Sequence, residues 1–146
     1  MAIVLACCVF LLLMTTLIHY EVLRFISLEL KTRRIPSRMK FIIVIVAAFA
    51  SHALQMVLYG MSYYGVIHGF ALGNLTGSPD SSWVNCLYFS VETFTSLGLG
   101  DILPSGPVRM IAGAEALNGL LLIGWSASFT YLAMERFWLP PAAADS

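Results

Sequence analysis

The residue types that could do chemistry in this sequence are concentrated in one short run, Thr93 to Asp101, which reads Thr-Phe-Thr-Ser-Leu-Gly-Leu-Gly-Asp. Two glycines one residue apart free the backbone from the usual restriction on φ, hydroxyl groups stand at Thr95 and Ser96, and a carboxylate follows at Asp101. A loop of this composition can present several backbone carbonyl oxygens together. Carbonyl oxygens aided by a hydroxyl can replace the water shell of a small monovalent cation, so this run is a candidate cation-binding loop.

The rest of the sequence has the composition of a membrane protein. The 146 residues are 59% hydrophobic and only 11% charged, with a mean hydropathy of +0.83. The formal net charge is zero, but five of the eight basic residues lie between Lys31 and Lys40. The three cysteines have no spacing typical of a disulfide framework or a redox motif, so we expect them to be small buried hydrophobic residues. The composition predicts one small membrane domain without a cofactor.

Three stretches are apolar and long enough to cross a hydrocarbon core of about 30 Å as helices. The sequence predicts an all-α membrane protein with an additional N-terminal transmembrane helix in residues 1–26 and a pore domain in residues 41–137. The basic linker, residues 27–40, contains the helix breaker Pro36 and is expected in the cytoplasm by the positive-inside rule, which makes nucleic-acid binding an unnecessary explanation. The N-terminus then lies outside a plasma or inner cell membrane, and residues 138–146 form a short cytoplasmic tail. A signal peptide is disfavoured because no basic residue opens the chain.

A fourth helix, predicted from Ser82 to Phe94 with Ser81 or Ser82 as its N-cap, is too short to cross the membrane. Its 12 or 13 residues rise only about 20 Å, so the chain must enter the membrane and turn back. Irregular backbone at membrane depth is tolerated only when it is buried in protein or lines a water-filled path. The candidate loop follows this helix directly, and one chain supplies only one wall of a cation cage. Four copies around an axis would close it, so we expect a homotetramer in the lipid bilayer.

Polar side chains within the expected spans need partners. Ser51, His52 and Gln55 are expected to form hydrogen bonds between helices rather than a metal site, because no second set of ligands accompanies them. Glu115 lies early in the last helix, where an acid is costly unless it has a partner or faces water, and Asn118 shares its face. Two interpretations of Glu115 stay open: it tunes conduction or gating from behind the loop, or it makes a structural hydrogen bond between helices.

The run from Ser90 to Asp101, Ser-Val-Glu-Thr-Phe-Thr-Ser-Leu-Gly-Leu-Gly-Asp, resembles the pore helix and selectivity filter of tetrameric potassium channels, whose usual filter reads Thr-Val-Gly-Tyr-Gly-Asp. This resemblance implies a passive, K+-selective channel that is not an enzyme. It also implies that Glu92 and Asp101 form a carboxyl pair behind the filter and that Gly119 lies near a gating hinge. The implied ion-binding residues are Thr95, Ser96, Leu97, Gly98, Leu99 and Gly100, with K+ held at Ser96, Leu97, Gly98 and Leu99.

Three positions depart from the usual pattern of that family. Ser96 stands where threonine is usual, Leu99 where tyrosine or phenylalanine is usual, and Phe89 where a tryptophan often bonds that tyrosine. The polar link behind the filter is therefore expected to be absent, which leaves a weakly selective monovalent cation channel or a non-conducting accessory subunit as alternatives. The Gly-x-Gly-Asp run also matches intramembrane aspartyl proteases. Their chemistry requires a second aspartate in a facing span, whereas the others here are Asp80 and Asp145, outside the expected spans.

Overall fold

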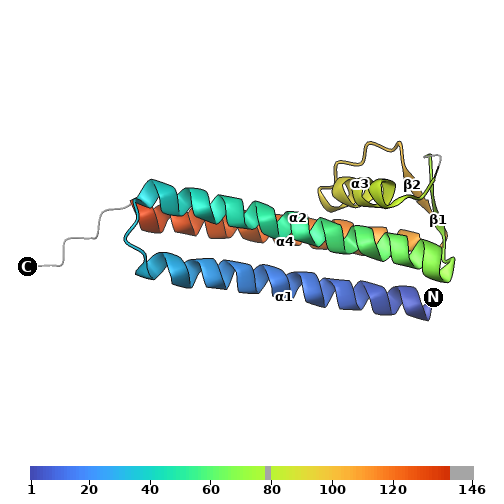
Figure 1. Ribbon diagram of the computed structural model, residues 1–146, viewed down its shortest axis with the longest axis horizontal. Coiled ribbons are helices and arrows are strands. Elements are labelled where there is room, and N and C mark those ends of the chain that lie inside the picture. The colour runs from blue at the N-terminus through green and yellow to red at the C-terminus, as the bar shows by residue number, and fades with distance from the viewer. Residues whose placement is uncertain (78–79, 139–146) are drawn as a thin grey trace, which may run out of the picture.

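Three long helices form the body of the molecule. The computed structural model describes residues 1–77 and 80–138, and its long helices are α1 (Ala2–Thr32), α2 (Ser37–Phe70) and α4 (Val108–Trp138). Figure 1 shows the three helices running alongside one another, and each contains an apolar stretch long enough to cross a membrane. Together with the short helix described below, they confirm the expected all-helical membrane fold with three spans and one re-entrant helix.

The basic linker is shorter than expected. Helix α1 continues to Thr32 and α2 begins at Ser37, so only residues 33–36 of the expected 27–40 linker lie outside helices. The side chain of Arg33 donates to Glu29 one turn earlier at 3.3 Å, which supports the extra turns at the end of α1. Pro36 supplies the break, because its ring cannot continue a helix interior. At the other end of the chain, residues 139–146 of the expected tail lie outside the described residues.

The segment between α2 and α4 folds back along one end of the bundle. It contains strand β1 (Asn74–Thr76), helix α3 (Trp83–Phe94) and strand β2 (Leu103–Ser105), and the two strands pair antiparallel with Leu75 opposite Pro104. This two-stranded sheet is an addition to the expected fold, and it ties together the two ends of the re-entrant segment (Figure 1). The N-terminus lies at the same end of the bundle, and α4 ends at the opposite end.

Ser82 is the N-cap residue of α3, one of the two predicted positions, and Asp80 supplies a hydrogen-bond acceptor just before it. Asp80 Oδ1 accepts hydrogen bonds from the backbone amide of Ser82 at 3.3 Å and from the side-chain amide of Asn85 at 2.8 Å, while Ser82 itself makes no side-chain cap bond. The hydrogen bonds from Ser82, with a smaller contribution from Asn85, lower the pKa of Asp80. A carboxylate therefore sits at the partly positive end of α3, and the partly negative end leads into the candidate loop.

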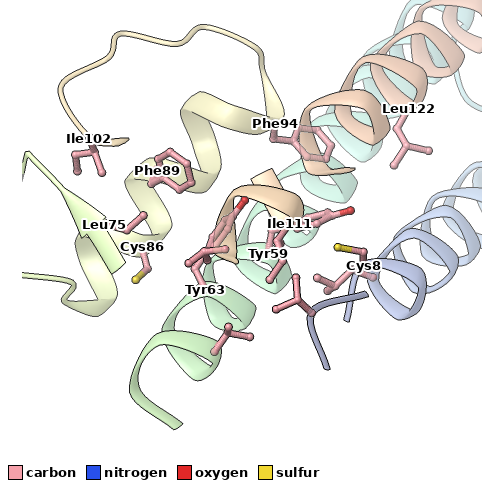
Figure 2. Close-up of a cluster of buried hydrophobic side chains, with 14 residues drawn as sticks. Cys8, Tyr59, Tyr63, Leu75, Cys86, Phe89, Phe94, Ile102, Ile111 and Leu122 are labelled. Atoms are coloured by element: carbon pink, nitrogen blue, oxygen red, sulfur yellow. The ribbon is translucent and has the colours of Figure 1, made fainter. Parts of the chain in front are cut away.

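A buried apolar cluster holds α3 against α2 and α4, and its side chains are drawn in Figure 2. The rings of Tyr63 and Phe89 meet edge to face at 5.1 Å, and Phe94 and Ile111 have no exposed surface. The outer faces of the long helices instead expose large apolar side chains, as expected where lipid is the solvent. They include Phe10, Leu13, Leu17, Val46, Phe49, Leu117 and Leu121.

Candidate functional site

The loop after α3 has a regular backbone pattern. Positive φ angles occur at alternate residues, with 56° at Ser96, 58° at Gly98 and 81° at Gly100. An alternation of left-handed and ordinary residues keeps a chain extended while its peptide planes face the same way, which a row of ion-binding carbonyls requires. The two glycines adopt positive φ without strain, whereas a non-glycine residue there is uncommon. The sequence indicated the glycine positions but not the left-handed conformation of Ser96.

This loop is exposed in the single chain. Every residue from Thr95 to Asp101 is exposed, and the side chains of Leu97 and Leu99 each keep 64% of their surface accessible. Figure 2 shows the chain leaving Phe94, arching away from the core and returning at Ile102. A loop with two exposed leucines and irregular backbone needs cover at membrane depth, so one chain is an incomplete site.

Two carboxylates hold the loop from behind, each through a different group. Glu92, which is only 4% exposed, accepts a hydrogen bond from the backbone amide of Leu99 at 2.8 Å. Asp101 accepts from the hydroxyl of Tyr88 at 3.1 Å. The resemblance implied that these two carboxyls pair with each other, but among the described residues no hydrogen bond joins them. The Tyr88 bond is a polar link that the sequence did not indicate. Phe89 and Leu99 have no polar side-chain atom, so the link usual between those two positions cannot form, and the ring of Phe89 packs on Tyr63.

Gly119 of α4 lies against the last residue of α3. A Cβ atom added at Gly119 would meet the carbonyl oxygen of Phe94 at 2.1 Å and its carbonyl carbon at 2.9 Å. Both are backbone atoms, so a side chain at this position would have to displace the end of α3. The structure thus gives Gly119 a close-packing role directly beneath the loop, whereas the role implied by the resemblance, a gating hinge, stays a prediction.

Glu115 and Asn118, the two polar residues of α4 that the sequence singled out, have separate partners. Glu115 has no exposed surface, and its carboxyl accepts from the hydroxyl of Tyr63 on α2 and lies 2.5 Å from the hydroxyl of Ser90 on α3. Asn118 donates instead to the hydroxyls of Thr15 on α1 at 2.7 Å and Tyr59 on α2 at 3.2 Å. The expected partner of Glu115 is therefore present, and Asn118 does not share it.

A closed ring of hydrogen bonds joins α1, α2 and α4. The amide NH2 of Gln55 donates toward Nδ1 of His19 at 3.3 Å, so Nε2 of His19 carries the proton and donates to the hydroxyl of Ser126 at 3.2 Å. That hydroxyl donates to Nε2 of His52 at 3.0 Å, and Nδ1 of His52 donates back to Gln55 Oε1 at 3.2 Å. The expected interhelical bonding of Ser51, His52 and Gln55 is confirmed, since Ser51 also bonds His19 at 3.1 Å.

Neither the contacts of Glu115 and Asn118 nor the ring of hydrogen bonds through His19 and His52 requires a metal ion. No cluster of three or more histidine, cysteine or acidic side chains that could hold a metal ion occurs in residues 1–77 and 80–138. Every buried side-chain nitrogen and oxygen in that part of the chain has a hydrogen-bond partner. The sequence missed the contribution of α1, because the partners His19 and Thr15 lie more than thirty residues from those they bond.

A cavity of about 570 Å³ opens between α2 and α4, below the end of α3. Thr95, the residue that leads into the loop, contributes to its lining. Most of the lining is apolar, and the remaining polar groups are His52, Ser126 and Thr130. The cavity therefore lies beside the partly negative C-terminal end of α3, where the helix dipole favours a cation.

The chain has the architecture of an integral membrane protein of the pore-loop type. It combines three long apolar helices with a re-entrant helix, which is followed by a glycine loop of alternating backbone conformation. A family model described as "Ion channel" matches residues 39–136. The chain belongs to this ion channel family, which is not a family of enzymes, and the resemblance to the potassium channel pore is confirmed.

Two curated relatives share parts of the pore region. The potassium channel protein kcv of Paramecium bursaria Chlorella virus 1 is 36% identical over 58 residues, which cover 38% of this chain and 62% of that protein. Two-pore potassium channel 1 of Arabidopsis thaliana is 37% identical over 51 residues, 34% of this chain and 14% of the relative. The chain thus matches less than two thirds of the length of either relative. No solved structure matches it.

Proposed function

We propose that four copies of this chain assemble around one axis and conduct K+ passively through their 96–100 loops. The observation that carries the proposal is the alternating backbone of Ser96, Gly98 and Gly100, held from behind through the Leu99 amide by Glu92. The loop is exposed in one chain, and three further copies would provide the missing walls of a carbonyl cage. Both curated relatives are named as potassium channels, which supports K+ as the permeant ion.

In this mechanism the protein replaces water around the ion without covalent chemistry. Carbonyl oxygens of Ser96, Leu97, Gly98 and Leu99 coordinate a dehydrated K+, and a second ion arriving at an adjacent ring displaces the first by knock-on. Four partly negative α3 ends would attract cations toward the cavity below Thr95. No cofactor takes part in these steps.

The orientation follows from charge. The basic residues around the α1–α2 connection belong on the cytoplasmic side of a plasma or inner cell membrane by the positive-inside rule. The N-terminus and the re-entrant segment share the opposite end of the bundle (Figure 1), which supports an orientation with the N-terminus and the loop on the outer side. The C-terminal end of α4 then faces the cytoplasm.

A weakly selective monovalent cation channel is the second candidate, favoured by the side chain at position 99. Leu99 offers no hydroxyl to any group behind the loop, and Phe89, which has no polar side-chain atom, packs on Tyr63. The Tyr88–Asp101 bond steadies only the outer end of the loop. Fewer polar supports permit the carbonyl rings to adapt to a smaller ion, which reduces discrimination between K+ and Na+.

Reversal potentials in mixed K+ and Na+, measured on the purified protein in planar bilayers, test both candidates. A K+-selective reversal potential supports the proposal, and equal permeability supports the weakly selective channel. Gly98→Ala should reduce conduction, because a side chain at a φ of 58° costs about 1 to 2 kcal/mol in each chain, whereas Gly65→Ala is the matched control with equally open surroundings and an ordinary φ. No current under any condition tried would favour a non-conducting accessory subunit.

A further inference from the structure

The carboxyl of Glu115 contacts two hydroxyl groups, one from each of two other helices. Tyr63 of α2 donates its hydroxyl hydrogen to Oε2 of Glu115. Ser90 Oγ of α3 lies 2.5 Å from Oε1 of Glu115 and 2.8 Å from the backbone carbonyl oxygen of Met56 on α2. Both contacts of Ser90 are short enough to require a hydrogen atom between the two oxygens.

Counting hydrogens decides the protonation state. The hydroxyl of Ser90 carries one hydrogen, and the carbonyl oxygen of Met56 carries none. If Glu115 were ionised, the single hydroxyl hydrogen of Ser90 would have to serve both Oε1 of Glu115 and the carbonyl oxygen of Met56. One of these two short contacts would then have no hydrogen between its oxygens. If Oε1 of Glu115 is protonated, it donates to Ser90, Ser90 donates to Met56, and every short contact contains one hydrogen.

The surroundings agree with this count. Glu115 has no exposed surface, and no lysine, arginine or histidine is hydrogen-bonded or ion-paired to it in the described part of the chain. The polar groups near it are the neutral hydroxyls of Tyr63 and Ser90, followed by Tyr59 and Asn118 about one turn away. An unpaired carboxylate in such a place is strongly disfavoured, and the neutral acid avoids that penalty.

We infer that Glu115 is held as a neutral carboxylic acid and is a positioning residue for the filter, an inference that rests on the proposed function. Its hydrogen bond to Ser90 fixes α3 against α2 and α4. Ser90 lies two residues before Glu92, which binds the amide of Leu99 in the loop. The carboxyl thus connects the inner helix to the filter through α3, with no contact to the ion.

Selectivity of substituted channels tests the positioning role. Glu115→Gln preserves both functions, because its amide N–H donates to Ser90 and its carbonyl accepts from Tyr63, so its K+/Na+ permeability ratio should stay within about twofold of the unsubstituted protein. Glu115→Leu keeps the volume and loses both hydrogen bonds, and its ratio should fall about three- to tenfold. The comparison is made at equal amounts of assembled channel. If Glu115→Leu does not assemble, Tyr63→Phe, which removes a single donor, takes its place with the same expected direction.

An infrared spectrum tests the neutral acid without any current. The purified protein in lipid should show the carbonyl stretching band of a protonated carboxylic acid, and the difference spectrum against Glu115→Gln should assign that band to Glu115. Absence of the band, or a Gln variant as defective as the Leu variant, would overturn the neutral acid. A Leu or Phe variant with unchanged selectivity would overturn the positioning role. A chain that carries no K+ current would overturn the proposed function and the positioning role with it, while the band would still decide the protonation state.

Discussion

Replacing Gly119 by alanine should displace the filter, because the new methyl group has no room. Its Cβ would lie 2.1 Å from the carbonyl oxygen of Phe94, where ordinary contacts begin at 3.4 Å, so α3 and α4 would have to separate by about 1.3 Å. Overpacking of this kind typically costs about 1 to 3 kcal/mol per chain, and about 4 to 12 kcal/mol in a tetramer. Phe94 is followed at once by Thr95 and the loop, so the displacement reaches the carbonyl rings.

Single-channel recording and thermal disassembly of the purified protein measure this effect. Gly119→Ala should lower both the K+ conductance of each channel and the temperature at which the assembly dissociates. Gly113→Ala and Gly124→Ala on the same helix are matched controls, since an added Cβ at either meets nothing within 4 Å, and each should be neutral or slightly stabilising by helix propensity. Normal conductance and stability of Gly119→Ala would refute the close contact. Normal conductance with altered opening in Gly119→Ala, and in neither control, would instead indicate a hinge at Gly119.

Three further substitutions probe the supports of the loop and of α1. Glu92→Ala leaves the Leu99 amide without its acceptor and should reduce the K+/Na+ permeability ratio by about five-fold or more, while Glu92→Gln keeps an acceptor and should resemble the unsubstituted protein. Leu99→Tyr combined with Phe89→Trp should raise that ratio by adding a polar link behind the loop, and an unchanged reversal potential would contradict the explanation offered for weak selectivity. Ser126→Ala removes the hydroxyl shared by two histidine rings and should destabilise the assembly by about 1 to 3 kcal/mol, measured by thermal disassembly against Ser128→Ala, whose exposed hydroxyl bonds only its own helix.

The overall fold could be predicted from sequence because its signals are local. Hydrophobic length identified three spans, the short distance from Ser82 to Phe94 required a re-entrant helix, and the glycines at 98 and 100 marked the irregular backbone after it. Each of these inferences depends on residues within one element. The break near Pro36 was likewise correct in place, although α1 continues to Thr32 and α2 begins at Ser37, which makes the linker shorter than expected.

The contacts behind the loop could not be derived in the same way. The bond between Tyr88 and Asp101 depends on how the loop curves back beside α3, which no spacing rule fixes. The partners of Asn118 come from α1 and α2, because burial on one face of a helix does not determine which neighbouring helix supplies the acceptor. The N-cap position at Ser82 was predicted, but Asp80 was missed as the acceptor before α3, since serines at 81 and 82 offered the same chemistry closer to the helix.

One face of α4 contacts all the other helices, so α1 is linked through α4 to α3 and the loop that follows it. Glu115 and Gly119 contact α3, Asn118 bonds α1 and α2, and Ser126 bonds a histidine from each of those two helices. Asn118 and Gly119 follow Glu115 by three and four residues, and Ser126 follows Gly119 by seven, so the four positions form a single stripe on one face of the helix. A displacement of α4 must therefore either carry α1 and α3 with it or break buried hydrogen bonds that have no water to replace them. Within residues 1–77 and 80–136, no such hydrogen bonds are recorded for the opposite face of α4, whose large side chains are exposed, among them Leu117, Leu120 and Leu121. In the proposed channel, movement of α4 and the state of the 96–100 loop are therefore expected to be coupled through the same stripe that contacts α1.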